Sequence, residues 1–393
     1  MSSVDQVRQQ LVDCELMTAE TAGNHIARWR EQTGAGESAA GEELLAWLVD
    51  QQVLTEFQSG ALHAGHAAPL MIGLYRVFDR AAIGRLGNIY RAVHDALGQA
   101  VSLKVFPSSL KDEPESLARM QREIQVSAEL DHPNVVRMYH MGQVGEIHYL
   151  AFEDLRGEPL HERLDREGAL HFATACALMR DAAQGLAHFH DKFLVHRDVR
   201  PANLWVTESG TLKVMESGAV RIALTGLTET EDGTVTTSDT VLGTYDYMAP
   251  EQAKSAHAAD HRSDIYALGC TTYHCLTGHP PFVERNPVRL VMRHASETPA
   301  PVTELVADIP EELADAVGSM LAKSPDERYQ SMEDVVHVLE QYADPTAPDA
   351  VLEASEDFLS WLRETPSHEL PESDSPQATA FLAWLAEGRP SSE

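Results

Sequence analysis

The chain has 393 residues and a formal net charge of −31, from 30 basic and 61 acidic side chains. This length suggests two or three folded units, and a hydrophobic share of 43 % is enough for a sizeable core. The acidity argues against nucleic-acid binding and against docking on an anionic membrane, because both attractions depend on Lys and Arg. Four scattered cysteines, no apolar run of membrane-spanning length and no signal peptide predict a soluble, cytoplasmic protein.

Composition divides the chain into three regions. Residues 1–70 are expected to form short amphipathic helices, an N-terminal helical adaptor region, because apolar residues recur there at roughly helical spacing: Val7, Leu11, Ile26, Trp29, Leu44, Leu48 and Phe57. Residues 71–342 carry a β-rich and then an α-rich pattern. Residues 343–393 form a tail with eleven acidic residues against two arginines, which predicts a largely disordered segment.

Two near-identical segments interrupt that tail, Phe358–Leu362 and Phe381–Leu385, and Leu44–Leu48 is related to them. In each tail copy Phe, Trp and Leu fall at positions i, i+3 and i+4, which share one face of a helix. Such a face fits an apolar groove. Three interpretations stay open: docking on this chain's own domain, docking on a partner protein, or chance.

The middle region begins with features that are weak when taken singly. Gly84 and Gly87 follow an extended apolar run, so their backbone could approach a phosphate, or could simply make a hairpin turn. Val101–Lys104 predicts a strand with a cation at its end. A helical pattern over Glu115–Leu130 then offers carboxylates as ion-pair partners for that cation.

A sharper signal follows at His196–Asn203. Its Asp198 and Asn203 lie five residues apart, a spacing that lets one accept a hydroxyl proton while the other holds a metal ion. A predicted strand over Leu212–Met215 then leads to Glu216, another carboxylate at a turn. The remaining motifs are Gly243–Glu251, Ser263–Gly269 and Arg328.

In this order, the motifs resemble those of the bacterial eukaryotic-type Ser/Thr protein kinases across about residues 75–340. The resemblance implies an α+β, two-lobed protein-kinase fold with a small lobe at 71–152, a large lobe at 156–342 and ATP between the lobes. It also implies transfer of the ATP γ-phosphoryl group to Ser or Thr of proteins.

Carried over position by position, the resemblance assigns a nucleotide site. Lys104 would hold the α- and β-phosphates and pair with Glu123, and Phe152 would be the gatekeeper. The hinge, residues 153–155, would bond adenine through its backbone. The nucleotide-binding positions are Gly84, Gly87, Ile89, Ser102, Lys104, Glu123, Glu153, Leu155 and Trp205.

The same resemblance assigns the chemistry. Asp198 would accept the substrate hydroxyl's proton, Arg200 would supply a cation near the γ-phosphate, and Thr244 would help to position Asp198. Asn203 and Glu216 would hold Mg²⁺. A buried ion pair between Glu251 and Arg328 would support the large lobe.

Several residues depart from the family pattern around one pocket. Glu216-Ser217-Gly218 replaces Asp-Phe-Gly, and Mg²⁺ tolerates a longer carboxylate poorly. Trp205 stands where a Leu-sized residue underlies adenine, and Ser127 replaces an apolar residue. Ala82 and Ser102 replace a loop glycine and an alanine above adenine. Two functions therefore stay open: a Ser/Thr kinase with weakened catalysis, or a pseudokinase that acts as a binding scaffold or allosteric regulator.

Two further features have local interpretations. Seven Ser and Thr residues between Thr228 and Thr240 could include a phosphoacceptor that pairs with Arg197, or could form a polar flexible loop. Cys270, His274 and Cys275 look like metal ligands but lie in an apolar stretch, which predicts core packing.

Overall fold

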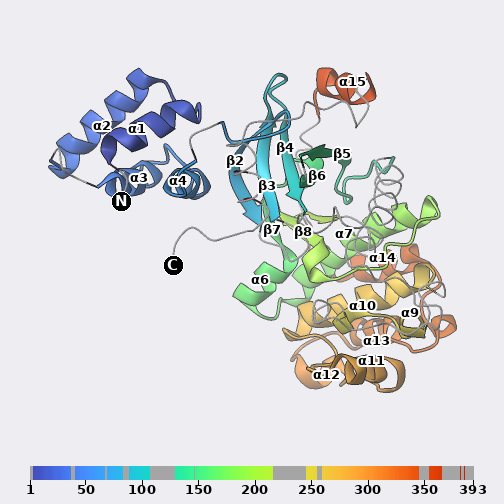
Figure 1. Ribbon diagram of the computed structural model, residues 1–393. Helices are drawn as coiled ribbons and strands as arrows, with labels where there is room; N and C mark the ends of the chain where they lie inside the picture. The colour runs from blue at the N-terminus through green and yellow to red at the C-terminus, as the bar shows by residue number, and fades with distance from the viewer. Residues whose placement is uncertain are drawn as a thin grey trace. The chain divides into compact units, whose positions relative to one another are not determined.

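Figure 1 shows the computed structural model, which describes residues 3–36, 40–66, 69–82, 88–106, 129–145, 147–215, 245–254, 259–344 and 354–364, together with 381 and 385. The chain divides into two compact units. The sheet unit comprises Met1–Asp112, Tyr139–Leu155 and Glu353–Glu393, and the helical unit comprises Glu113–Met138 and Arg156–Leu352.

Four short helices open the sheet unit: α1 (Val4–Asp13), α2 (Ala19–Thr33), α3 (Gly41–Asp50) and α4 (Glu56–His63). Helices α1 and α4 each begin with a capping box, in which Ser3 or Thr55 exchanges hydrogen bonds with a Gln three residues later. All seven apolar residues that predicted these helices are buried. The prediction of short amphipathic helices is therefore confirmed.

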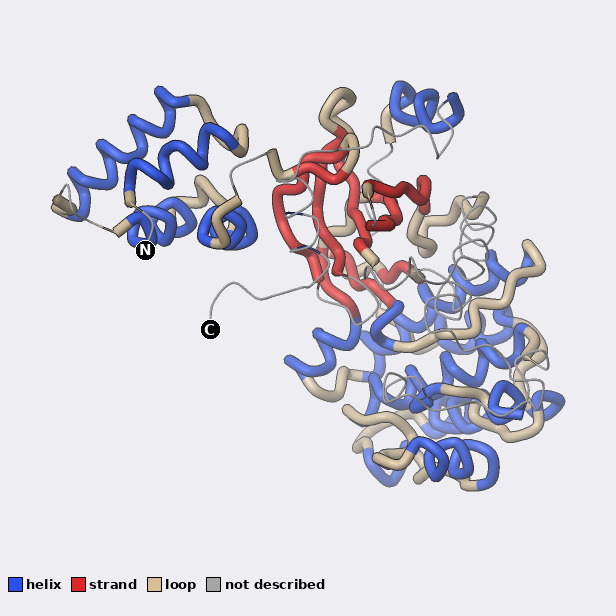
Figure 2. Tube along the Cα trace, viewed as in Figure 1, coloured by secondary structure: helices blue, strands red, loops and turns tan. Residues whose placement is uncertain are grey.

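The sheet has six strands in the order β1-β2-β3-β4-β6-β5. Their bounds are β1 (Met71–Ile72), β2 (Tyr75–Ala82), β3 (Asn88–His94), β4 (Ala100–Val105), β5 (Met138–Val144) and β6 (Ile147–Glu153). Neighbours from β1 through β6 pair antiparallel, and Figure 2 shows the strands in red beside the N-terminal helices. Strand β4 confirms the strand that Val101–Lys104 predicts.

The N-terminal helices and the sheet share one apolar core. That core joins residues of α1–α4, such as Trp29 and Phe57, to sheet residues such as Tyr90 and Leu103. Polar contacts reinforce it: the Thr55 hydroxyl donates to the Phe78 carbonyl at 2.7 Å. The change of pattern near residue 70 thus marks a change of secondary structure, while the core continues across it.

The tail adds to the same core. Helix α15 (Glu356–Glu364) carries the first Phe-Leu-x-Trp-Leu motif, and its Phe358 is fully buried in the sheet unit's apolar core. Phe381 and Leu385 of the second motif are buried there as well. Of the three interpretations left open, docking on the chain's own domain is the one these contacts support. Of the tail, residues 343–344, 354–364, 381 and 385 are described, and the remainder lies outside the described residues.

The helical unit is built around two long, central helices, α7 (Phe172–Asp191) and α10 (His261–Thr277). A small antiparallel sheet of β7 (Gly157–Pro159), β8 (Leu204–Thr207) and β9 (Leu212–Val214) packs beside α7. The other α-helices among the described residues of this unit are α6 (Leu160–Glu167), α9 (Pro250–Lys254), α11 (Pro287–Ser296), α12 (Val302–Leu305), α13 (Glu311–Met320) and α14 (Met332–Glu340).

Cys270 and Cys275 lie fully buried in α10. His274 is hydrogen-bonded through Nδ1 to the Tyr247 hydroxyl at 2.7 Å. Cys270 and Cys275 belong to the apolar core of the helical unit, as the apolar stretch predicts. In the part of the chain that the structure describes, no group of three or more His, Cys, Asp and Glu could hold a metal ion. None of the described helices combines the length and apolar character needed to cross a bilayer.

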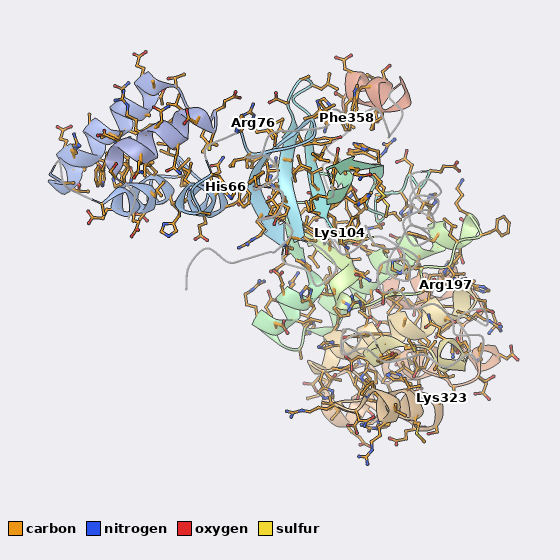
Figure 3. All side chains as sticks on the ribbon, in the orientation of Figure 1. His66, Arg76, Lys104, Arg197, Lys323 and Phe358 are labelled. Atoms are coloured by element: carbon orange, nitrogen blue, oxygen red, sulfur yellow. The ribbon has the colours of Figure 1, made fainter. Side chains whose placement is uncertain are left out.

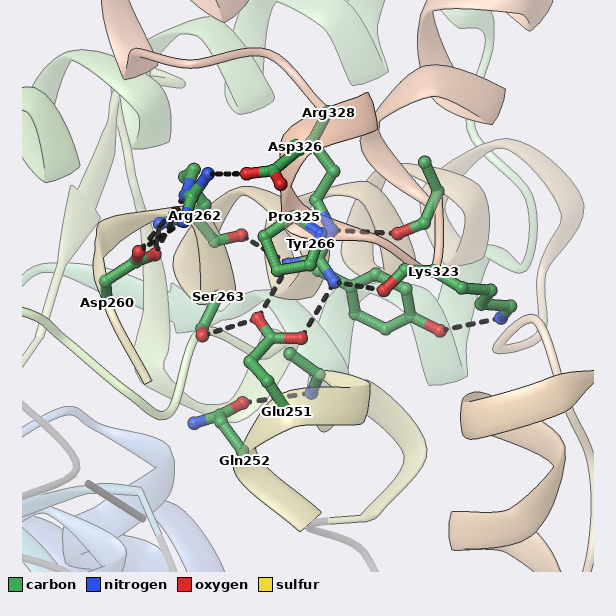
Figure 4. Close-up of polar contacts among 12 residues, drawn as sticks. Glu251, Gln252, Asp260, Arg262, Ser263, Tyr266, Lys323, Pro325, Asp326 and Arg328 are labelled. Carbon is green, nitrogen blue, oxygen red and sulfur yellow. Dashed lines mark hydrogen bonds and ion pairs between the residues drawn. The ribbon is translucent and has the colours of Figure 1, made fainter. Parts of the chain in front are cut away.

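The predicted ion pair between Glu251 and Arg328 is present in the helical unit (Figure 4). The Arg328 guanidinium donates to both carboxylate oxygens of Glu251, at 2.7 and 2.8 Å, and its side chain is fully buried. It also donates to backbone carbonyls of Arg262, Ala322 and Lys323. Burial alone would raise the pKa of Glu251, but hydrogen bonds from Arg328 and Ser263 hold it below its usual value.

We expect Arg328→Ala to lower the free energy of unfolding by about 3–5 kcal/mol, because it leaves the Glu251 carboxylate buried without its partner. Urea unfolding followed by tryptophan fluorescence measures the loss. Arg163→Ala is the matched control, since Arg163 pairs with Glu167 at 3.1 Å on the surface of α6; we expect it to cost less than about 1 kcal/mol. Equal losses in the two variants would contradict a structural role for the buried pair.

Candidate active site

In the segment between α7 and β8, two side chains lie against the carboxylate of a third, Asp198. Asp198 is buried, and the Asn203 amide Nδ2 donates to both its backbone carbonyl and its Oδ2, each at 2.8 Å. The Arg200 Nε lies 3.3 Å from the same Oδ2. The structure therefore brings together Asp198, Arg200 and Asn203, three of the predicted site residues.

A second carboxylate, that of Asp264 near the start of α10, anchors the backbone of this loop. It is almost fully buried and accepts the backbone N–H groups of His196 and Arg197, both at 2.8 Å, and lies 2.9 Å from His190 Nε2. Burial by itself would raise the pKa of Asp264, but these partners, His190 first, lower it. The ionised carboxylate thus fixes the backbone just before Asp198.

Sequence reasoning missed this role of Asp264, although it singled out the motif Ser263–Gly269. The available signal was an acidic residue inside an otherwise apolar helix, because a buried carboxylate requires hydrogen-bond partners. Arg197, whose backbone N–H donates one of these bonds, has a φ of 65°. That left-handed conformation is costly for a residue with a side chain and is held in place by Asp264.

His196 packs in the core and hydrogen-bonds on both sides of its ring. Its ring is fully buried, Nδ1 accepts the Asp198 backbone N–H at 3.3 Å, and Nε2 bonds the Met215 carbonyl at 3.0 Å. The Met215 N–H in turn donates to the Asn203 carbonyl at 2.9 Å. Both ends of the segment His196–Asn203 are thereby bonded to Met215.

Trp205 lies on β8 next to this loop. Its neighbours Leu204 and Val206 belong to the core of the helical unit, and alternation along the strand directs Trp205 to the other face. The indole is fully buried, and its Nε1 has no hydrogen-bond partner among the described residues. That it fills part of a nucleotide pocket stays a prediction.

The sheet unit carries the other predicted positions. Ile89 of β3 pairs in register with Lys104 of β4, and Arg91 pairs with Ser102. Because side chains alternate along a strand, these four share one face of the sheet. Lys104 is labelled in Figure 3.

The segment Glu153–Leu155 is tied to that same face. Arg91 forms a bidentate ion pair with Asp154: its Nε donates to Oδ1 at 3.1 Å and its Nη2 to Oδ2 at 3.3 Å. The Asp154 side chain is buried. The backbone N–H of Leu155 donates to the Ser102 hydroxyl at 3.1 Å in a buried setting. The segment after β6 is thus anchored to both β3 and β4.

Five of the predicted site residues lie outside the described residues: Gly84, Gly87, Glu123, Glu216 and Thr244. The same is true of Ser127, Ser217 and the Ser and Thr residues between Thr228 and Thr240. Arg197, their predicted phosphate partner, has a buried Nε with no hydrogen-bond partner among the described residues.

Comparison with known proteins matches residues 75–339 to the protein kinase domain family. The chain is 34 % identical to the serine/threonine-protein kinase PknB of Mycolicibacterium smegmatis over 70 % of this chain and 44 % of that protein. It is 32 % identical to PrkC of Bacillus subtilis over 67 % and 39 % of the two chains. The chain belongs to the protein kinase family, and it resembles the bacterial eukaryotic-type Ser/Thr kinases within it.

A solved structure gives the same fold. The PknI kinase domain of Mycobacterium tuberculosis is 24 % identical, with a TM-score of 0.54 over 70 % of this chain and 98 % of that one. The two-lobed α+β kinase fold is therefore confirmed. The chain spans about two-fifths of the length of the curated relatives it matches.

The Leu155 contact lies in the segment that the kinase resemblance assigns to the hinge. The resemblance assigns the backbone of residues 153–155 to adenine, yet the Leu155 N–H already has an acceptor in the Ser102 hydroxyl. The residue at position 102 is also one of the departures from the family pattern. A nucleotide that uses this N–H has to displace the serine first.

We expect Ser102→Ala to tighten binding of a fluorescent ATP analogue by about 2- to 10-fold, because the lost competition is one neutral hydrogen bond. Titration with Mg²⁺ present measures the dissociation constant. Tyr149→Phe is the control, since it removes a buried hydroxyl from the sheet without touching Leu155. Binding that is unchanged by Ser102→Ala, or undetectable in both proteins, would contradict the prediction.

Proposed function

We propose that this chain is a Ser/Thr protein kinase that transfers the γ-phosphoryl group of ATP to proteins, with weakened catalysis. The observation that carries the proposal is the arrangement of Asp198, Arg200 and Asn203. All three are brought to one point of a loop that Asp264 holds rigidly.

The contacts of these residues suit the proposed chemistry. Asp198 presents a carboxylate oxygen that can accept the proton of a substrate hydroxyl. The Asn203 amide nitrogen is used on Asp198, which leaves its carbonyl oxygen, a ligand type that Mg²⁺ accepts. Arg200 places a positive charge beside them, where it would offset the charge of a transferring phosphoryl group.

Two features support weakened rather than full activity. Glu216 would have to hold the second metal position with a side chain one methylene longer than Asp, and Ser102 competes with adenine for the hinge. The second feature also favours the alternative function, a pseudokinase that works as a binding scaffold or allosteric regulator. In that case the sheet unit would retain its fold without productive nucleotide binding.

We expect slow phosphoryl transfer from radiolabelled ATP to a generic Ser/Thr substrate protein with Mg²⁺, and no transfer above background by Asp198→Asn. Glu216→Asp should raise the rate by about 10- to 100-fold, because a displacement near 1 Å at a reacting centre costs about that much. Melting temperatures with ATP alone, with Mg²⁺ and with Mn²⁺ measure binding separately from transfer.

The outcomes separate the two functions. Transfer that depends on Asp198 supports the kinase. A nucleotide-induced rise in melting temperature without transfer, even after Glu216→Asp, would overturn it in favour of the pseudokinase. A melting temperature that no nucleotide changes would remove nucleotide-dependent function altogether.

A further inference from the structure

The second tail motif is docked on one face of strand β3. The carbonyl oxygen of Leu385 accepts two hydrogen bonds from this strand, one from the Tyr90 hydroxyl at 2.8 Å and one from the Asn88 Nδ2 at 3.2 Å. The Phe381 ring lies 6.4 Å from that of Phe57, and Phe57 lies 5.5 Å from Tyr90. The motif therefore joins helix α4 to the start of β3.

The first tail motif covers the same face at the other end of the strand. His94, the last residue of β3, contacts the Trp361 ring at 4.6 Å and the Phe358 ring at 5.8 Å. Asn88, Tyr90 and His94 are separated by even numbers of residues, so they share a face. Figure 3 labels Phe358 well apart from His66, whose ring lies 5.4 Å from Phe381.

The opposite face of β3 belongs to the candidate nucleotide site. Ile89, between Asn88 and Tyr90, is the residue that the kinase resemblance places against the nucleotide. Arg91, the next residue after Tyr90, holds the hinge through its ion pair with Asp154. One short stretch of strand thus binds the tail on one side and the hinge on the other.

We propose that docking of the second tail motif on β3 is an intramolecular brake on nucleotide binding, which rests on the proposed function of this site. Adenine needs the Leu155 N–H, so the hydrogen bond between Leu155 and Ser102 has to break and the hinge has to rearrange around the base. Arg91 links a movement of the hinge to β3, and the bonds from Tyr90 and Asn88 to Leu385 hold that strand in place. Release of the motif lets β3 adjust and raises nucleotide affinity.

Coupling of this kind is reciprocal. If the docked motif lowers nucleotide affinity by some factor, bound nucleotide lowers the affinity of the motif by the same factor. This reciprocity distinguishes a brake from a merely structural contact. Loss of a merely structural contact would lower the stability of the fold, but bound nucleotide would not weaken that contact.

The test uses the full chain and a fluorescent ATP analogue with Mg²⁺. Tyr90→Phe keeps the ring and removes one of the two bonds to Leu385, and we expect it to tighten the dissociation constant about threefold. Phe381→Ala removes the motif's buried ring and should tighten it about tenfold. Phe358→Ala is the matched control, the same substitution in the first motif, and should change it less than about twofold.

Hydrogen exchange across residues 381–385 gives the reciprocal measurement, and we expect faster exchange when the ATP analogue is bound. Melting temperatures without nucleotide show that each variant is folded. Equal affinity in wild type, Tyr90→Phe and Phe381→Ala would overturn the brake while leaving nucleotide binding intact. Absence of binding in every protein, including Ser102→Ala, would overturn both the brake and the proposed function.

Discussion

Side chains of a β-strand alternate between its two faces, and this constraint gives β3 its central place in the sheet unit. Asn88, Tyr90 and Ala92 face the apolar core that the N-terminal helices and the tail complete, whereas Ile89 and Arg91 face the hinge and Lys104. A shift of register by one residue would exchange the two sets and leave Arg91 in the apolar core. The tail contacts and the candidate nucleotide positions therefore depend on the same register.

In the helical unit, buried carboxylates fix the backbone on which the candidate site depends. The loop that carries Asp198 has backbone N–H groups without strand or helix partners, and buried N–H groups need acceptors. Asp264 accepts two of them, and Glu251 is joined to the same region because Gln252, its neighbour, donates to the Arg197 carbonyl at 3.1 Å. The geometry around Asp198 is thus determined by residues far from it in sequence.

Local patterns predicted part of this architecture, and the resemblance to the protein kinases predicted more. Helical periodicity predicted α1–α4, and motif spacing predicted related roles for Asp198 and Asn203. The ion pair of Glu251 with Arg328 was implied by the resemblance alone. The bonds from Asn88 and Tyr90 to Leu385 could not be predicted, because they join positions almost 300 residues apart through a backbone carbonyl. A carbonyl carries no signal in the sequence, since every residue has one.

Ser102 shows why a departure from a family pattern needs its structural setting. Compared with alanine, serine adds a hydroxyl in a fully buried position, and a buried hydroxyl without a partner destabilises the fold. The Leu155 N–H satisfies that hydroxyl, and the serine in turn satisfies an N–H that has no partner in the sheet. The serine therefore stabilises the segment after β6 in the structure described. If a nucleotide uses the Leu155 N–H, as the kinase resemblance implies, it replaces the bond to Ser102, and only the difference between the two hydrogen bonds contributes to its affinity at that point.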